Sequence, residues 1–230
     1  MIYLKRVVAI AVAGLLGVSL AAAQEMSVEE SYLQESVENM IIREQSQALG
    51  RDTKLVALEY INQAIRHGNT SDDVRNALEY LVLEGLTNQT RENGRLINNF
   101  PDVRRQAAIY LGEIGTPEAK DTLLKVMLAE TEPMVLTEAV KSLAKIGLND
   151  NEETANTIAW VVRRFNTIGP DNLLALASLD AFETLAKKSG GVKDPNTLRS
   201  IMLIANGRYI KPVQDRAQQL MFDLRQYSPK

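Results

Sequence analysis

This 230-residue chain contains one histidine and no cysteine, so carboxylates are its most numerous candidates for acid–base or metal chemistry. Without thiols, the chain cannot form disulfides, thiolate metal sites or cysteine nucleophiles. The single histidine, His67, excludes any site that needs two imidazoles. It stands beside Gly68 at the end of a predicted helix, where a solvated histidine is the expected interpretation. The sequence therefore predicts no metal-binding residues.

Pairs of adjacent carboxylates are the remaining candidates for acid–base chemistry. They are Glu29-Glu30, Asp72-Asp73 and Glu152-Glu153. Each pair stands where a helix is expected to start, and negative charge at that place complements the helix dipole. No serine has a G-x-S-x-G context, and Gly190-Gly191 lacks the spacing of a phosphate-binding loop. We therefore predict no catalytic residues, no cofactor and no cofactor-binding residues, and we expect that the protein is not an enzyme.

The first residues have the three parts of a secretory signal peptide. Lys5 and Arg6 precede an uninterrupted apolar run over residues 7–20, and three alanines ending at Ala23 follow. We expect cleavage near Ala23, so that residues 1–23 are the signal and the protein is periplasmic or secreted. The alternative is an uncleaved anchor, because about 17 apolar residues could just span a bilayer. A membrane is a predicted partner only in that case.

The charge balance does not favour binding to nucleic acid. The chain has 26 Lys and Arg residues and 29 Asp and Glu residues, and loss of Lys5 and Arg6 with the signal makes it more acidic. Phosphate backbones are bound by basic surfaces. Aromatic residues make up only 5% of the chain, which also argues against a platform for base stacking. No nucleic-acid partner is predicted.

From residue 27 onward the apolar residues recur with helical spacing, and no convincing strand is apparent. We expect an acidic N-terminal helix within residues 24–50, followed by helices over 52–66 and 71–85. Residues 87–100 are rich in asparagine and predict a long loop. Later helices are expected to open close to a proline, whose missing N–H has no helical partner in the first turn. Their predicted first residues are Pro101, Pro117, Pro133, Asn151, Pro170, Pro195 and Pro212.

An internal repeat is the strongest pattern in the sequence. Residues 107–115 read AAIYLGEIG and residues 139–147 read AVKSLAKIG, at an offset of 32 residues. A further copy starts at Ala181, and a degraded copy starts at Ala217. A regular repeat of this length indicates stacked supersecondary units that each bury an apolar face against the next unit.

Within each copy, a small and a large apolar residue stand four positions apart on one helix face. These residues are Ala107 and Leu111 in one copy, and Ala139 and Leu143 in the next. The alanine lets a neighbouring helix approach closely while the leucine fills the groove beside it. We therefore predict that these four residues form the contacts between stacked repeats.

The segment over residues 101–119, PDVRRQAAIYLGEIGTPEA, resembles the HEAT repeat family. It is most similar to the short bacterial variety that is also found among relatives of phycobilin lyases. The resemblance implies an all-α fold, an α-solenoid of antiparallel helix pairs in a HEAT/armadillo-like superhelix, over residues 51–230. It also implies that Arg104 has the role of the family's arginine, which ties neighbouring repeats together. The next copy departs from this pattern, because Leu136 stands where Arg104 would be repeated.

Two features predict where a partner binds. The only tryptophan lies in a very apolar helix, so it is either a core residue or an interface anchor flanked by two arginines. Residues 187–230 contain nine Lys and Arg against three Asp, whereas residues 24–42 contain five Glu and no basic residue. The candidate partner-binding residues are Trp160, Arg163, Arg164, Arg208, Lys211 and Arg216.

Three functions are consistent with these observations. The favoured one is a non-catalytic, exported HEAT-repeat scaffold or adaptor that binds other proteins of the cell envelope. The second is an adaptor of the same fold that is tethered by residues 7–22, and the third is a lyase-type ligand carrier or enzyme with a deep polar pocket. The charge asymmetry reflects either two solvated ends or a binding surface. Such a surface would meet an acidic partner, anionic lipid or cell-wall polymer, or a second copy in head-to-tail self-association.

Overall fold

The computed structural model describes residues 28–192 and 194–225. The predicted signal peptide at residues 1–23 lies outside the described residues, so cleavage and export stay predictions. Within the described ranges the secondary structure comprises ten α-helices, one short 3-10 turn over Asp150–Glu152 and one small hairpin. None of these helices is long and apolar enough to cross a membrane.

The helices begin close to the residues that the sequence predicts. Their bounds are α2 Val28–Gln47, α3 Arg51–Arg66, α4 Asp72–Leu83, α5 Pro101–Ile114, α6 Pro117–Ala129, α7 Pro133–Ile146, α8 Glu153–Ile168, α9 Asn172–Ser189, α10 Pro195–Asn206 and α11 Lys211–Leu224. Proline is the first residue of α5, α6, α7 and α10, as predicted. The starts of α8, α9 and α11 differ from the prediction by one or two residues.

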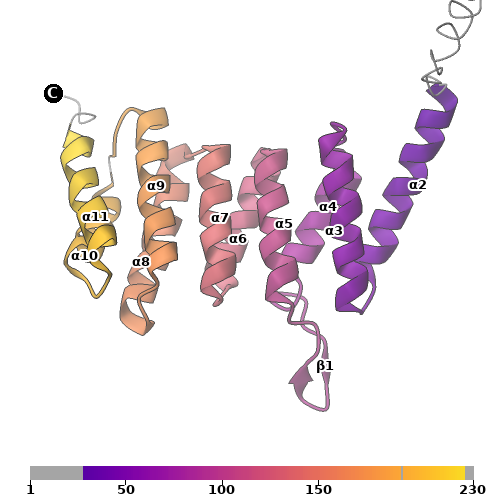
Figure 1. Ribbon diagram of the computed structural model, residues 1–230, viewed down its shortest axis with the longest axis horizontal. Helices are drawn as coiled ribbons and strands as arrows, with labels where there is room; N and C mark the ends of the chain where they lie inside the picture. The colour runs from indigo at the N-terminus through magenta and orange to yellow at the C-terminus, as the bar shows by residue number, and fades with distance from the viewer. Residues whose placement is uncertain (1–27, 193, 226–230) are drawn as a thin grey trace, which may run out of the picture. The chain divides into compact units, whose positions relative to one another are not determined.

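The chain divides into two compact units, residues 1–37 and residues 38–230. The described part of the first unit is the beginning of α2. In the second unit the helices form two rows (Figure 1): α3, α5, α7, α9 and α11 pack side by side in one row, and α4, α6, α8 and α10 pack in the other. Successive helices alternate between the rows, so each helix pair stacks on the next. The prediction of an all-α, HEAT-like solenoid is confirmed.

The two best internal copies fold alike. Helices α5 and α7 each contain 14 residues and lie next to each other in the same row. Each ends at a glycine in the left-handed conformation, Gly115 with φ of 73° and Gly147 with φ of 74°. A residue with a side chain is strained in this conformation, so glycine is the residue that ends the helix here.

The prediction of a simple loop over residues 87–100 is wrong. The strands β1 (Arg91–Glu92) and β2 (Arg95–Leu96) form an antiparallel hairpin there, which extends beyond the end of α5 (Figure 1). Their turn is Asn93-Gly94, with φ of 49° and 80°. This dipeptide favours a two-residue hairpin turn because both residues tolerate positive φ.

The base of the hairpin is held by Asn98, whose side chain is buried. The side-chain oxygen of Asn98 accepts a hydrogen bond from the N–H of Thr90 at 2.9 Å. Its side-chain nitrogen donates to the carbonyl oxygen of Asn88 at 2.7 Å. One buried amide therefore joins two backbone groups just before β1, and the carbonyl of Asn88 also accepts from the N–H of Gly85 at 3.1 Å.

Candidate functional site

The side chain of Arg104 in α5 is almost completely buried although it carries a charge. Its Nε donates to Oε2 of Glu130 at 2.7 Å, and one Nη donates to Oδ1 of Asn99 at 2.9 Å. The same Nη reaches the carbonyl oxygen of Glu84 at 3.4 Å. Because Glu84 follows α4 and Glu130 follows α6, one guanidinium joins the ends of two helices in the opposite row. Burial of a charge is tolerated only with such pairing.

Sequence reasoning missed a second buried ion pair of the same kind. The Nζ of Lys54, which has no exposed surface, lies 2.7 Å from Oε2 of Glu84 and donates to the carbonyl of Ser46 at 2.9 Å. Lys54 is the fourth residue of α3, and Arg104 is the fourth residue of α5. A basic residue at that helix position is therefore the sequence signal. The fourth residue of α7 is Leu136, which is buried among apolar side chains.

The four apolar residues assigned to repeat stacking lie in the core that runs through the solenoid. These residues, Ala107, Leu111, Ala139 and Leu143, have no exposed surface. They belong to α5 and α7, which pack against each other in one row. Helices α5 and α7 are thus held together by an apolar contact, and Arg104 also joins α5 to the ends of α4 and α6.

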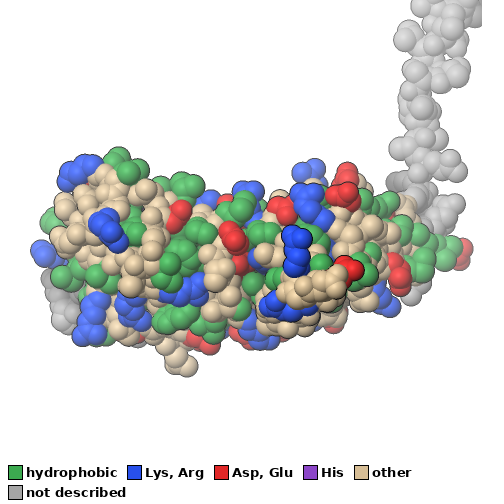
Figure 2. Space-filling model, turned by 90° about the horizontal axis from the view of Figure 1, so that it is seen from below, with side chains coloured by type: hydrophobic (Ala, Val, Ile, Leu, Met, Phe, Trp, Pro, Cys, Tyr) green, Lys and Arg blue, Asp and Glu red, His purple; other side chains and the backbone are tan. Residues whose placement is uncertain are grey.

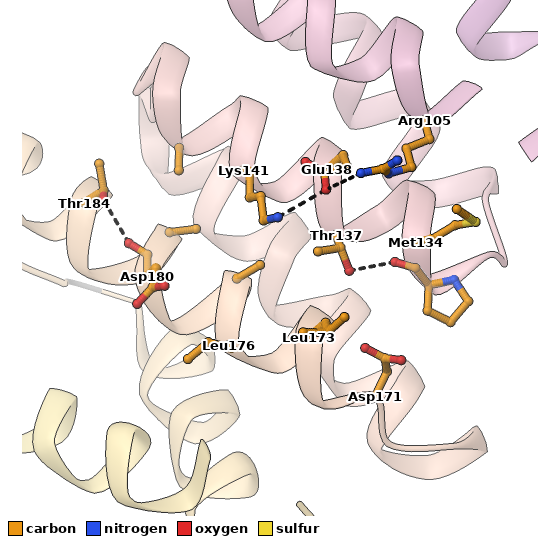
Figure 3. Close-up of a pocket in the computed structure, with 14 residues that line it drawn as sticks. Arg105, Met134, Thr137, Glu138, Lys141, Asp171, Leu173, Leu176, Asp180 and Thr184 are labelled. Carbon is orange, nitrogen blue, oxygen red and sulfur yellow. Dashed lines mark hydrogen bonds and ion pairs between the residues drawn. The ribbon is translucent and has the colours of Figure 1, made fainter. Parts of the chain in front are cut away.

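A groove of about 500 Å³ lies between α7 and α9 (Figure 3). Its larger apolar lining residues are Met134, Leu173 and Leu176, and Leu173 is 70% exposed. Small side chains keep the space between the helices open; they are Ala144, Ala177 and Ala181. An exposed apolar concavity of this kind is typical of a binding site.

The two walls of this groove differ in charge. On the α7 side, Oε1 of Glu138 lies 3.3 Å from Arg105 and 3.1 Å from the Nζ of Lys141, so two cations share one carboxylate. On the α9 side the charged residues are Asp171 and Asp180. Figure 3 shows the set with Arg105 and Lys141 above the apolar residues, and the two aspartates beyond either end of the leucines on α9. The groove therefore has a basic wall and an acidic wall.

The acidic wall is tied to α11 by Arg216, one of the predicted partner-binding residues. Its guanidinium donates to Oδ1 of Asp180 at 2.9 Å and also contacts Glu183. Lys187 contacts Glu183 from the next turn of α9 at 2.6 Å. The hydrogen bond from Lys187, and after it the one from Arg216, hold the pKa of the Glu183 carboxyl below its usual range. Arg216 thus has partners within the chain.

Residues 95–166 are similar to one known repeat family. They match the family model of HEAT repeats. The matched segment runs from β2 into α8, and it contains the Arg104–Glu130 pair and the α7 wall of the groove. No curated protein and no solved structure matched the chain. HEAT repeats generally mediate protein–protein interaction, so the match supports a binding role for the surfaces around α7.

The predicted site residues of α8 lie near the end of the segment that matches HEAT repeats, and the two arginines among them contact neighbouring repeats. Trp160 is 37% exposed, and the guanidinium of Arg164 lies 5.1 Å from the centre of its ring. Arg164 also donates to the carbonyl oxygen of Glu130. Arg163 donates to Oδ1 of Asn196 in α10 at 3.1 Å. Both arginines therefore connect α8 to neighbouring repeats. Trp160 is exposed rather than a core residue, and Arg164 lies over its ring.

The remaining predicted site residues stand at the C-terminal repeats. Arg208 is exposed in the turn between α10 and α11. Lys211, the first residue of α11, is also exposed, and its Nζ lies 2.7 Å from Oδ1 of Asp215. Across the described part of the chain, no group of three or more His, Cys, Asp or Glu side chains could hold a metal ion.

Proposed function

We propose that the protein is a non-catalytic HEAT-repeat scaffold that is exported and binds a protein of the cell envelope. The groove between α7 and α9 carries the proposal, because it is apolar, open and bordered by charges of opposite sign. Stacked repeats present extended surfaces of this kind to partners. Export is supported by the basic, apolar and small residues over 5–23.

The chemistry of the groove favours an amphipathic helix as the bound segment. A stripe of apolar residues at helical spacing would lie over Leu173, Leu176 and Met134, as in other helix-in-groove complexes. One edge of that helix would carry acidic residues toward Arg105 and Lys141, and the other would carry basic residues toward the acidic wall. This charge pattern fixes the direction in which the helix lies.

The experiment is a crosslinking pull-down from intact cells, with a tagged chain expressed from its own N-terminal segment. The Leu173→Gln variant changes a largely exposed side chain of the groove, so we expect it to fold and to recover at least about tenfold less partner. The matched control is Leu128→Gln, an exposed leucine of α6 outside the groove. We expect it to recover one stoichiometric envelope complex, as wild type does.

Two results would overturn the proposal. One is recovery of the protein alone from cells in which it is abundant and folded. The other is fractionation with cytoplasmic proteins. The mass of the purified chain separates cleavage near Ala23 from a retained N-terminal anchor, because only cleavage removes residues 1–23.

A further inference from the structure

A second groove, of about 530 Å³, lies between α8 and α10 in the opposite row of helices. Its apolar residues are Met202 and Leu203, and Met202 is 53% exposed. Its charged lining residues are Arg163 and Arg199, and no carboxylate of the described residues lines it. Figure 2 shows Lys and Arg side chains among hydrophobic ones at the end formed by α10 and α11. This groove therefore fits an apolar segment that carries negative charge.

Such a segment is present on α2 of the same chain. Leu33, Val37 and Met40 recur at the spacing of one helix face, and they are 64%, 50% and 59% exposed. Glu29 stands four residues before Leu33, and Glu44 stands four residues after Met40, so the apolar stripe has an exposed carboxylate at each end. We call these five residues the α2 stripe.

The one basic residue of α2 does not offset this charge. Arg43 is the only Lys or Arg in the helix, and its Nη lies 2.7 Å from Oδ1 of Asp73 at the start of α4. The stripe thus presents apolar side chains between two separated negative charges.

We propose that the α2 stripe of one copy binds in the α8–α10 groove of a second copy. Leu33, Val37 and Met40 would cover Met202 and Leu203, and a carboxylate at one end of the stripe would approach the arginines of the groove. Every copy carries both the stripe and the groove, so the contact is head-to-tail and each copy can bind two others. The inference rests on the proposed function in treating the solenoid as a protein-binding surface.

The charges favour this groove over the one between α7 and α9. Three carboxylates line the α7–α9 groove, namely Glu138, Asp171 and Asp180. Arg105 and Lys141 also line that groove, but both already pair with Glu138. A stripe with a carboxylate at each end would meet a like charge on the α9 wall, which is unfavourable in a contact from which water is removed. The α8–α10 groove offers only arginines to the same stripe. The two grooves therefore select different segments, one for a partner and one for a second copy.

The experiment is sedimentation velocity of the purified chain over a concentration series at low and high salt. We expect the wild-type sedimentation coefficient to rise with protein concentration and to fall when salt screens the charge pairs. The groove variant combines Arg199→Glu with Met202→Gln, and the stripe variant combines Leu33→Gln with Met40→Gln. Both variants change exposed side chains, and each should weaken association at least about tenfold. The control Leu128→Gln should associate as wild type does.

Mixing the two variants distinguishes a head-to-tail contact from any other. The groove variant keeps its stripe and the stripe variant keeps its groove, so together they should form a one-to-one dimer that does not grow further. A wild-type chain that stays monomeric at about 100 µM would overturn the inference, as would variants that associate like wild type. Leu173→Gln should associate normally. Failure of this inference is therefore separable from failure to bind an envelope partner.

Discussion

Gly112 of α5 lies directly against Ser142 of α7: a Cβ atom on residue 112 would stand 2.6 Å from Cβ and 2.9 Å from Cα of Ser142. Glycine is a poor helix residue, so the helix that contains Gly112 gains nothing from it. The close approach of the neighbouring repeat accounts for it. The same contact fixes the spacing of α5 and α7, and α7 forms one wall of the candidate binding groove.

We expect Gly112→Ala to destabilise the protein although alanine favours a helix by about 1 kcal/mol. The added methyl must displace the backbone of α7, and overpacking of this kind costs about 1–3 kcal/mol. A net loss of about 1 kcal/mol should be measurable by urea denaturation. Combining Gly112→Ala with Ser142→Gly removes the side-chain atoms nearest to the added methyl. The loss of unfolding free energy in the double variant should then be smaller than the sum of the two single losses. A variant more stable than wild type would contradict this close contact.

Leu111→Ala tests the packing of the stacked repeats. Leu111 has no exposed surface, and large-to-small changes at such positions cost about 2–5 kcal/mol in free energy of unfolding. Leu128→Ala is the control, because Leu128 is exposed and exposed positions usually change stability by about 0.5 kcal/mol or less. If Leu111→Ala costs less than about 1 kcal/mol in the same denaturation assay, the assigned facing of α5 is wrong.

Arg104→Ala is expected to loosen the contact between neighbouring repeats. The change leaves the Glu130 carboxylate buried without its cation, and loss of one partner of a buried ion pair costs about 3–5 kcal/mol. We expect a lower melting temperature and faster proteolysis of the segments after α4 and α6. Adding Glu130→Gln removes the unpaired charge and should recover part of the loss. Melting and proteolysis identical to wild type would show that the family's arginine role does not transfer to Arg104.

The pH dependence of stability should include a contribution from Glu183. Its folded-state pKa lies below the ordinary value of 4.5, first because of Lys187 and then because of Arg216. A lowered folded pKa means that the stabilisation is complete above pH 4.5 and is lost as the pH falls through the folded value. We expect Glu183→Gln to lower stability at pH 7 and to flatten its decline below pH 4.5.

Urea denaturation at a series of pH values from 3 to 7 measures the Glu183 contribution. Arg216→Met should reduce the same acid-dependent change, because it removes one of the two cations that contact Glu183. If the unfolding free energy of both variants changes with pH as it does in wild type, the contacts of Glu183 add nothing to folding.

Sequence alone determined the helices and their order, because the signals that begin and end a helix act on the backbone of a few neighbouring residues. Pro101 and Pro133 start α5 and α7, and Gly115 and Gly147 end them, as the repeat predicts. The Asn93-Gly94 turn is an equally local signal. The hairpin was missed because its flanking residues are polar and show no alternation.

Only the tertiary structure decided which polar side chains are buried and where the grooves lie. Lys54 and Glu84 are 30 residues apart in the chain, and their 2.7 Å contact depends on how two helices pack. Leu173 is 70% exposed at the α7–α9 groove although its helix is largely apolar. Burial and electrostatic pairing depend on neighbours in space, and residue types and spacing along one helix do not specify those neighbours.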